Sequence, residues 1–416
     1  MTMPSLALHQ RTAIRTARAE AHAAVVGARD ASLDYLRAFI VVLVLVHHAV
    51  LAYAMMWPGQ PRTFQILPAP IVDPQRFAGF DLLAIFNDTF FMALMFLLSG
   101  LFVWPSLARK GAAKFLRERM LRLGVPFVVA AGLLMPLAYY PSYAVTGGEP
   151  GFAGYARAWF SLGFWPSGPA WFVSLLLVFD AVAAAIYALR SKRTMVAKAP
   201  WLLTLQKRPS VLVALLVVAS ALVYIPLELA FGADRWFSFG PFALQASRPL
   251  LYATYFLAGA WIGASGSTSG CLGRDAEVAR QWPIWLAAGL VAYLLRLVVV
   301  IVLILPVAKA HQPLPLGVRL LNDLTVALCC GTISVALLAV FRRFAISHRP
   351  VFDSLSASSY GMYLVHYPIV VWLQFALLAV AAGPIAKGTI VSVGAIALSW
   401  GFVVALRRIP VIARVL

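Results

Sequence analysis

Charged residues are scarce in this sequence, since Asp, Glu, Lys and Arg together make up 12% of its 416 residues. A soluble globular domain carries about 25% charged residues, with roughly half of its residues apolar. Here 62% of the residues are hydrophobic. This composition excludes a soluble globular domain and predicts a polytopic membrane protein.

Acidic residues are the scarcer charged class, with 15 Asp and Glu against 34 Lys and Arg and a net charge of +19. Such an excess is also found in proteins that bind nucleic acids. Most basic residues, however, lie in short segments between apolar runs, where the preference of cytoplasmic loops for Lys and Arg explains them. We therefore expect no nucleic-acid partner.

Cysteine is nearly missing, with Cys271, Cys329 and Cys330 as the three examples. An odd number of cysteines, two of them adjacent in an apolar run, offers no even disulfide framework. The sequence also lacks the His-Glu-x-x-His, Cys-x-x-Cys, Walker and Gly-x-Gly-x-x-Gly motifs. We expect neither a structural disulfide nor a metal cofactor.

Long apolar runs are abundant, and about 20 such residues in a helix cross the hydrocarbon core of a bilayer. They predict an all-α polytopic protein with about ten transmembrane helices. The expected ranges are 33–56, 82–104, 123–140, 169–189, 210–229, 249–265, 283–305, 320–340, 357–380 and 388–406. Residues 1–32 are then a basic N-terminal tail, and residues 33–416 form a ten-helix membrane domain.

The distribution of Lys and Arg predicts the orientation of these helices. With the N-terminus inside, cytoplasmic segments hold 24 of the 34 basic residues and outer loops hold 8. Because cytoplasmic loops are enriched in Lys and Arg, we expect both termini to be cytoplasmic.

Two connecting segments have an unusual composition. The inner segment 105–122 contains six basic residues and one acidic residue, and the outer segment 139–169 is rich in Tyr, Trp and Phe. The first suits a phosphorylated donor, although positive-inside topology alone also explains it. The second suits stacking on sugar rings, or else an aromatic belt at the membrane interface.

The first span carries ionisable residues that a membrane helix accommodates only at a cost, which points to function. Arg37 and His48 are 11 positions apart, which places them within about 20° of each other on a helix and roughly 16 Å apart along its axis. His47 lies about 80° off that face. His48 is a candidate general base, with an interhelical hydrogen bond as the alternative.

Other polar residues fall within the predicted spans. Tyr360, Tyr363 and His366 recur every three positions and form a polar stripe, which either contacts a substrate or joins neighbouring helices. Asp180 and Arg296 both fall near the middle of their spans, and we expect them to compensate each other as a buried pair.

Four motifs follow one another along the chain: Leu33-Asp34-x2-Arg37-x10-His48, Phe90-Phe91 with Ser99-Gly100, Phe115-x3-Arg119-x2-Arg122-Leu123-x2-Pro126, and Tyr360-x2-Tyr363-Leu364-x-His366. In this order they resemble the membrane-bound acyltransferase family 3. The resemblance covers about residues 32–406. The segment 121–126 looks most like the branch that contains the glucan-biosynthesis succinyltransferases.

The resemblance implies transfer of an acetyl or succinyl group from cytoplasmic acyl-CoA to a hydroxyl of a carbohydrate or glycolipid, in the bacterial inner membrane. His48 would be the base, with Arg37 positioning a substrate and Asp34 orienting Arg37. The residues expected to hold the CoA phosphates are Lys114, Arg119 and Arg122. Those expected to contact the acceptor are Ser99, Trp171, Tyr360, Tyr363 and His366.

Two other kinds of membrane protein compete with this interpretation. In a transporter, Arg37 and His48 would line a substrate or proton path. A lipid-linked glycosyltransferase commonly needs acidic residues in an outer loop, and before the second span the sequence offers Asp73 and Asp81 without a paired motif. Labelled acyl-CoA distinguishes the enzyme from the transporter, which would release neither acylated product nor free CoA.

Overall fold

The computed structural model describes residues 31–57, 59–189, 208–265, 272–273 and 276–415. Within these ranges the chain is helical apart from its connections and one antiparallel pair of strands, which confirms an all-α polytopic membrane fold. The predicted tail, residues 1–32, lies outside the described residues except for Ala31 and Ser32, which open the first helix.

Eight helical segments of the described chain are long and apolar enough to cross a membrane. Seven are built on one main helix each: α2 (Ala31–Leu51), α3 (Ala78–Gly100), α9 (Trp171–Leu189), α11 (Pro209–Phe231), α14 (Trp282–Val298), α16 (Leu316–Phe344) and α18 (Pro384–Leu406). The eighth is a composite of α5 (Ala112–Arg119), η1 (Met120–Gly124), α6 (Val125–Val129), η2 (Ala130–Leu134) and α7 (Met135–Ala144).

The two remaining predicted spans coincide with α12 (Pro249–Ala264) and α17 (Pro350–Ala376). At 16 residues α12 is short for a crossing, and α17 carries the polar stripe that lowers its apolar character. Each of the ten predicted ranges thus overlaps a helix of the structure, although the ranges 33–56 and 357–380 extend a few residues beyond the ends of α2 and α17. The number of crossings and the side on which the termini lie stay predictions.

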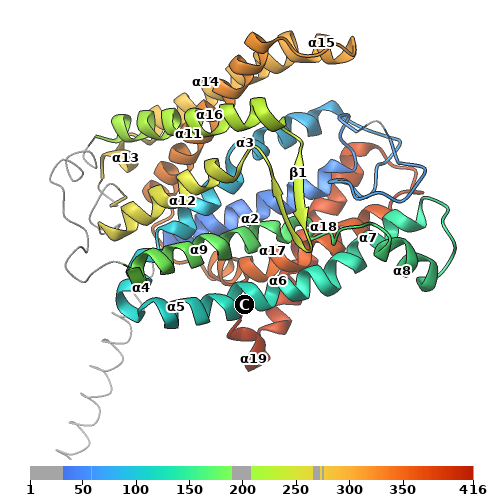
Figure 1. Ribbon diagram of the computed structural model, residues 1–416, viewed down its shortest axis with the longest axis horizontal. Helices are drawn as coiled ribbons and strands as arrows, with labels where there is room; N and C mark the ends of the chain where they lie inside the picture. The colour runs from blue at the N-terminus through green and yellow to red at the C-terminus, as the bar shows by residue number, and fades with distance from the viewer. Residues whose placement is uncertain (1–30, 58, 190–207, 266–271, 274–275, 416) are drawn as a thin grey trace, which may run out of the picture.

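Short elements connect these helices. They are α4 (Val103–Lys110), α8 (Phe152–Phe160), η3 (Gly168–Ala170), β1 (Trp236–Phe239), β2 (Phe242–Gln245), α13 (Glu277–Arg280), η5 (Val299–Ile304), α15 (Leu305–Lys309) and α19 (Pro410–Ala413). Figure 1 shows α4 and the start of α5 at one end of the bundle and α8 at the opposite end. We call residues 103–122 the basic end and residues 145–170 the aromatic end.

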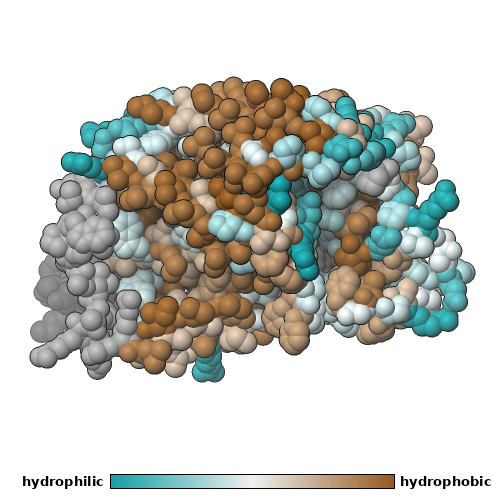
Figure 2. Space-filling view, turned by 45° about the horizontal axis from the view of Figure 1, so that its top comes forward, coloured by the Kyte–Doolittle hydropathy of each residue, from teal (hydrophilic) through white to brown (hydrophobic). Residues whose placement is uncertain are grey.

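The helices differ strongly in how deeply they are buried. In the segment from α3 to α4 and in α16, 72% of the apolar stretch of 18 residues that could cross the membrane is buried inside the protein. The corresponding share is 17% in α11 and 11% in the segment from α14 to α15. Apolar side chains such as Leu222 on α11 and Val291 on α14 are exposed, and Figure 2 shows a broad hydrophobic surface on one side of the molecule. These faces suit contact with lipid, whereas α3 and α16 form the centre.

Glycines in α12 allow its backbone to come into direct contact with the backbone of α3. A Cβ atom at Gly259 would lie 2.1 Å from the Leu97 carbonyl oxygen, and one at Gly263 would lie 2.0 Å from that of Leu101. Contacts of this kind are typical of small residues at membrane helix interfaces. The close crossing fixes the position of α3 and of the functional residues that α3 carries.

The composite helix contains two π-helical turns, η1 and η2, and each has a carbonyl that accepts a hydrogen bond from a distant aromatic side chain. The Tyr360 hydroxyl donates to the Arg122 carbonyl at 2.5 Å, and Trp165 Nε1 donates to the Ala131 carbonyl at 2.8 Å. Because π turns break the regular helical hydrogen-bond ladder, these donors help to stabilise the irregular backbone.

The predicted pair between Asp180 and Arg296 is wrong. Asp180 is fully buried and its Oδ2 lies 3.1 Å from Nε of Arg119, whereas Arg296 donates to Asn322 at 3.0 Å. The pair was predicted because both residues lie near the middle of their spans. Helix packing, however, places each of them next to a different residue.

The central rings of the aromatic segment are buried, while Phe152 and Phe160 are exposed. The central rings pack against one another and against α17, in a cluster that includes Tyr139, Tyr143, Tyr155, Trp159 and Tyr367. Burial raises the pKa of the Tyr155 phenol, which stays neutral and donates to the Pro136 carbonyl at 2.6 Å. This cluster anchors the aromatic end to the helix that carries His366.

Cys329 and Cys330 are buried and free, in agreement with the expected lack of a disulfide at these positions. Cys271 lies outside the described residues.

Candidate active site

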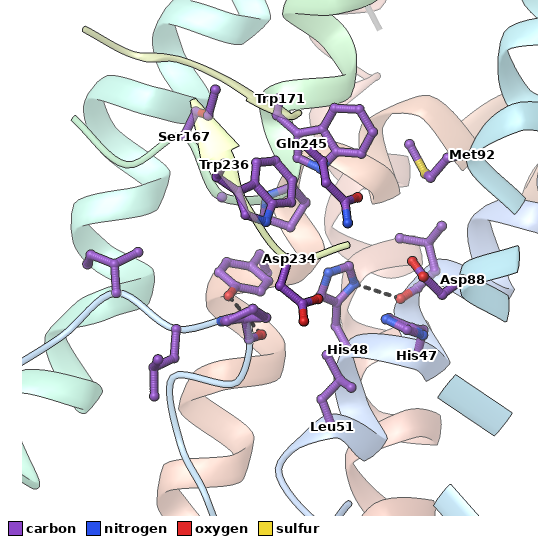
Figure 3. Close-up of a pocket in the computed structure, with 18 of the residues that line it drawn as sticks. His47, His48, Leu51, Asp88, Met92, Ser167, Trp171, Asp234, Trp236 and Gln245 are labelled. Atoms are coloured by element: carbon purple, nitrogen blue, oxygen red, sulfur yellow. Dashed lines mark hydrogen bonds between the residues drawn. The ribbon is translucent and has the colours of Figure 1, made fainter. Parts of the chain in front are cut away.

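A cavity of about 720 Å³ lies between α2, α3, α9, α17 and the β1–β2 hairpin. In Figure 3, His47 and His48 enter it from α2, Asp88 from α3, Trp171 from α9, and Trp236 and Gln245 from the hairpin. Ligand sites are commonly cavities of about 300–1,000 Å³ with mostly apolar walls and a few converging polar groups. The cavity has this character.

His48 is held in one orientation by its own helix. Its Nδ1 lies 2.8 Å from the Val44 carbonyl oxygen, four residues earlier in α2. A carbonyl oxygen only accepts, so Nδ1 carries the proton and the other ring nitrogen, Nε2, has a free lone pair in the neutral ring. Figure 3 shows this second nitrogen on the cavity side of the ring.

His366 on α17 lies beside the protonated nitrogen of His48 and helps to hold the ring in this orientation. Its Nδ1 lies 2.6 Å from the Tyr363 carbonyl oxygen, which makes its Nε2 the acceptor. That Nε2 lies 3.4 Å from Nδ1 of His48, and the two rings are 5.1 Å apart. The His48 Nδ1–H therefore faces two acceptors, the Val44 carbonyl and His366.

The backbone at His48 is also held by α17. Gln374 Nε2 donates to the carbonyls of His48 and Ala49 at 2.8 Å and 3.0 Å. Both carbonyls belong to the last turn of α2, where helix carbonyls have no partner within the helix. Gln374 is buried and supplies the missing donors, so it helps to fix the position of the end of α2 from which His48 enters the cavity.

A second polar group in the cavity is formed by His47, Asp88 and Arg248. Asp88 pairs with Arg248, whose Nη1 also donates to the Asp88 backbone carbonyl at 2.8 Å. The Asp88 side chain is 50% exposed to the cavity, while Arg248 is buried behind it. His47 Nδ1 has no hydrogen-bond partner within the described residues, and Figure 3 shows the ring beside Asp88. The polar lining thus extends beyond His48.

The opposite wall is aromatic. Trp171 stacks on Tyr252 with ring centroids 5.6 Å apart and meets Trp236 of the hairpin edge-on at 5.8 Å. Asp234 and Gln245 flank this wall at the base of the hairpin. The wall presents flat apolar faces with a carboxylate and an amide at their border.

The predicted site residues divide into two groups. His48, Tyr363 and Trp171 line the cavity, and His366 lies directly behind His48. Tyr363 also donates its hydroxyl to the Pro169 carbonyl. Ser99 does not line the cavity; its hydroxyl donates to Met95 within α3 at 2.8 Å.

The other predicted residues lie toward the basic end. Asp34 Oδ1 and Arg37 Nη1 are 3.1 Å apart, which confirms the expected ion pair, and Arg37 lies over the Phe102 ring at 5.3 Å. Lys114 and Arg122 are exposed, and Arg119 is occupied by Asp180. Tyr360 contacts this end through the Arg122 carbonyl. The structure therefore separates the residues expected to hold the donor from those around His48.

Several functional candidates were missed from the sequence. The β1–β2 hairpin could have been recognised from two aromatic-rich runs on either side of Gly240-Pro241, where Gly240 adopts a positive φ of 53°. Arg248 directly precedes an apolar run, but nothing local showed that it would contact Asp88. Gln374 gave no signal beyond being polar in a predicted span.

In the part of the chain that the structure describes, no group of three or more His, Cys, Asp or Glu residues is arranged to hold a metal ion.

A comparison with protein families matches residues 30–404 to the model described as an acyltransferase domain, of acyltransferase family 3. Searches among curated proteins and among solved structures found no match.

Proposed function

The chain belongs to membrane-bound acyltransferase family 3, and from this premise we propose that it moves an acyl group from acyl-CoA to a hydroxyl of a carbohydrate or glycolipid. His48 acts as the general base in this reaction. The observation that carries the proposal is the His48 ring, whose Nδ1–H is held by the Val44 carbonyl while Nε2 faces a cavity of substrate size.

The chemistry follows from the orientation of this ring. The acceptor hydroxyl gives its proton to His48 Nε2 as its oxygen attacks the thioester carbonyl carbon. The carbon–sulfur bond then breaks, and the departing thiolate takes the proton from the imidazolium, so an acyl ester and free CoA are formed. During the transfer the Val44 carbonyl and His366 Nε2 accept from the Nδ1–H and stabilise the positive charge on the ring.

The acceptor binds on the side of the aromatic end. Faces such as those of Trp171 and Trp236 suit the apolar faces of sugar rings, and Asp234 and Gln245 provide acceptors and donors for hydroxyl groups. The partly apolar lining of the cavity also limits access of water to the thioester.

The donor binds from the basic end, which we assign to the cytoplasm of a bacterial inner membrane. Arg122 and Lys114 are exposed there and suit the phosphates of CoA. Arg119 adds positive charge, although Asp180 already engages it. Arg37, oriented by Asp34, lies between this cluster and His48 along α2.

The test uses purified protein, radiolabelled acetyl-CoA or succinyl-CoA and envelope glycans, with acylated product and free thiol measured together. We expect His48→Ala to lower transfer by about 100-fold or more, because general-base catalysis contributes roughly 10²–10⁴ in rate. Added imidazole should restore part of this loss. His348→Ala is the matched control, because His348 is exposed and lies outside the cavity.

Three outcomes bear on the proposal. Normal transfer by a correctly inserted His48→Ala protein would exclude the role of the base. Failure of the wild-type protein to produce either acylated glycan or free CoA would favour transport instead. Mass spectrometry of glycans from cells with and without the gene identifies the acyl group by its mass.

A further inference from the structure

Arg296 is a cation on the cavity wall that the proposed reaction does not use. Trp285, Gly289 and Ala292 are the buried residues of α14, and Arg296 continues this stripe with helical spacing. It therefore faces inward, toward α16, rather than toward lipid. It also lines the same cavity as His48.

The partners of Arg296 are neutral. Its Nη1 donates to Asn322 Oδ1 at 3.0 Å and lies 3.5 Å from the Thr325 hydroxyl. Nε is buried and has no hydrogen-bond partner, and no carboxylate lies within ion-pair distance in the described residues. A guanidinium has five N–H donors and stays charged, so this one keeps unused donors beside the cavity.

The carboxylates nearby are engaged elsewhere or lie on another wall. Asp88 is paired with Arg248, and Asp323 accepts from the amide of Asn322, which stands between it and Arg296. Asp234 lies at the base of the hairpin. An arginine inside a membrane span is costly and is normally paired or functional. The unused charge therefore suits an anionic group of a ligand.

We propose that Arg296 binds a carboxylate of a substrate in this cavity, an inference that rests on the acyl transfer proposed above. Two sources carry the same chemistry: the free carboxylate of a dicarboxylic acyl group, and the carboxylate of an acidic sugar in the acceptor. Guanidinium donors match carboxylate oxygens and give a short, charge-assisted contact. Arg296 thereby selects charged over neutral substrates.

The experiment compares substrates that differ only in this charge. In the first arm, transfer of succinyl and butyryl groups from their CoA thioesters to a neutral glucan oligosaccharide is measured for wild type and Arg296→Gln. In the second arm, acetyl transfer is measured to a glucose oligosaccharide and to one that contains glucuronate. Binding of succinyl-CoA and butyryl-CoA is measured in parallel by thermal shift, which needs no turnover.

The readout is the ratio of charged to neutral substrate, so a general loss of activity or stability cancels. We expect Arg296→Gln to lower kcat/KM for the charged substrate by about 10- to 100-fold relative to the neutral one. Loss in the first arm identifies the acyl carboxylate, and loss in the second identifies the acceptor carboxylate. Arg296→Lys should keep part of the preference.

Arg157→Gln is the matched control, because Arg157 is exposed on α8 and pairs with Glu149 away from the cavity. Ratios that are equal in wild type and Arg296→Gln, in both arms and in binding, would overturn the proposal and leave Arg296 a structural residue. Failure of acyl transfer with every pair, together with preferential binding of succinyl-CoA that Arg296→Gln abolishes, would refute the proposed function alone.

Discussion

The pair of Arg119 and Asp180 allows a structural role to be separated from a role in donor binding. The Asp180 side chain is 0% exposed and that of Arg119 is 24% exposed, so removal of the arginine leaves a buried carboxylate without its counterion. Loss of one partner from a buried pair costs about 3–5 kcal/mol. Because Arg119 is partly exposed, we expect the lower end, about 3 kcal/mol or roughly 100-fold in the folding equilibrium, for Arg119→Gln.

The double variant Arg119→Gln/Asp180→Asn should regain most of this stability, because the buried charge is then removed together with its partner. Thermal unfolding of the detergent-solubilised protein measures all four members of the cycle. Arg117→Gln is the control, since Arg117 is exposed on the same helix. We further expect the double variant to keep a raised KM for acyl-CoA, because the positive charge of Arg119 is still missing.

The stability prediction and the KM prediction are contradicted by different results. If Arg119→Gln unfolds at the wild-type temperature, or if the double variant is no more stable than Arg119→Gln, the buried pair does not stabilise the fold as argued. If the double variant is stable and binds acyl-CoA with the wild-type KM, Arg119 serves only Asp180 and is not part of the donor site.

Two further changes test the supports of the cavity. Gln374→Leu should lower acyl transfer and reduce stability by about 1–3 kcal/mol in thermal unfolding, because two buried carbonyls at the end of α2 lose their donor; unchanged activity would contradict its role in placing His48. Gly259→Ala should destabilise by about 1–3 kcal/mol, since its Cβ would meet the Leu97 backbone, whereas Gly401→Ala, with open space around it, should not.

Local patterns in the sequence predicted what depends on local geometry. Apolar runs marked the long helices, because about 20 such residues match the membrane thickness. The orientation of Arg37 by Asp34 was expected from the family resemblance, and the two residues do form an ion pair, since residues three apart are neighbours on a helix. Helical phase placed His48, and not His47, on the face of Arg37.

Contacts between helices could not be obtained in this way. Helical phase gives the face on which a residue lies but not the neighbour that packs there, so Asp180 was assigned to Arg296 although Arg119 is its partner. The same limit hid the contact of Gln374 with the end of α2. No role was expected for His47, because its angular position around the helix differs from that of Arg37. The cavity nevertheless is wide enough to be lined by both histidines.

The arrangement of α2 explains why the two motif residues on this helix are separated by three turns. Arg37, Val41, Val44 and His48 follow one another on the same face, and the cavity lining reaches Val44 but not Arg37. At about 1.5 Å per residue, Val44 lies roughly 10 Å from Arg37 along the axis. If the donor is held by its phosphates at the basic end, as proposed above, it needs a long, uncharged arm to bring its thioester to His48. The pantetheine arm of CoA has this shape.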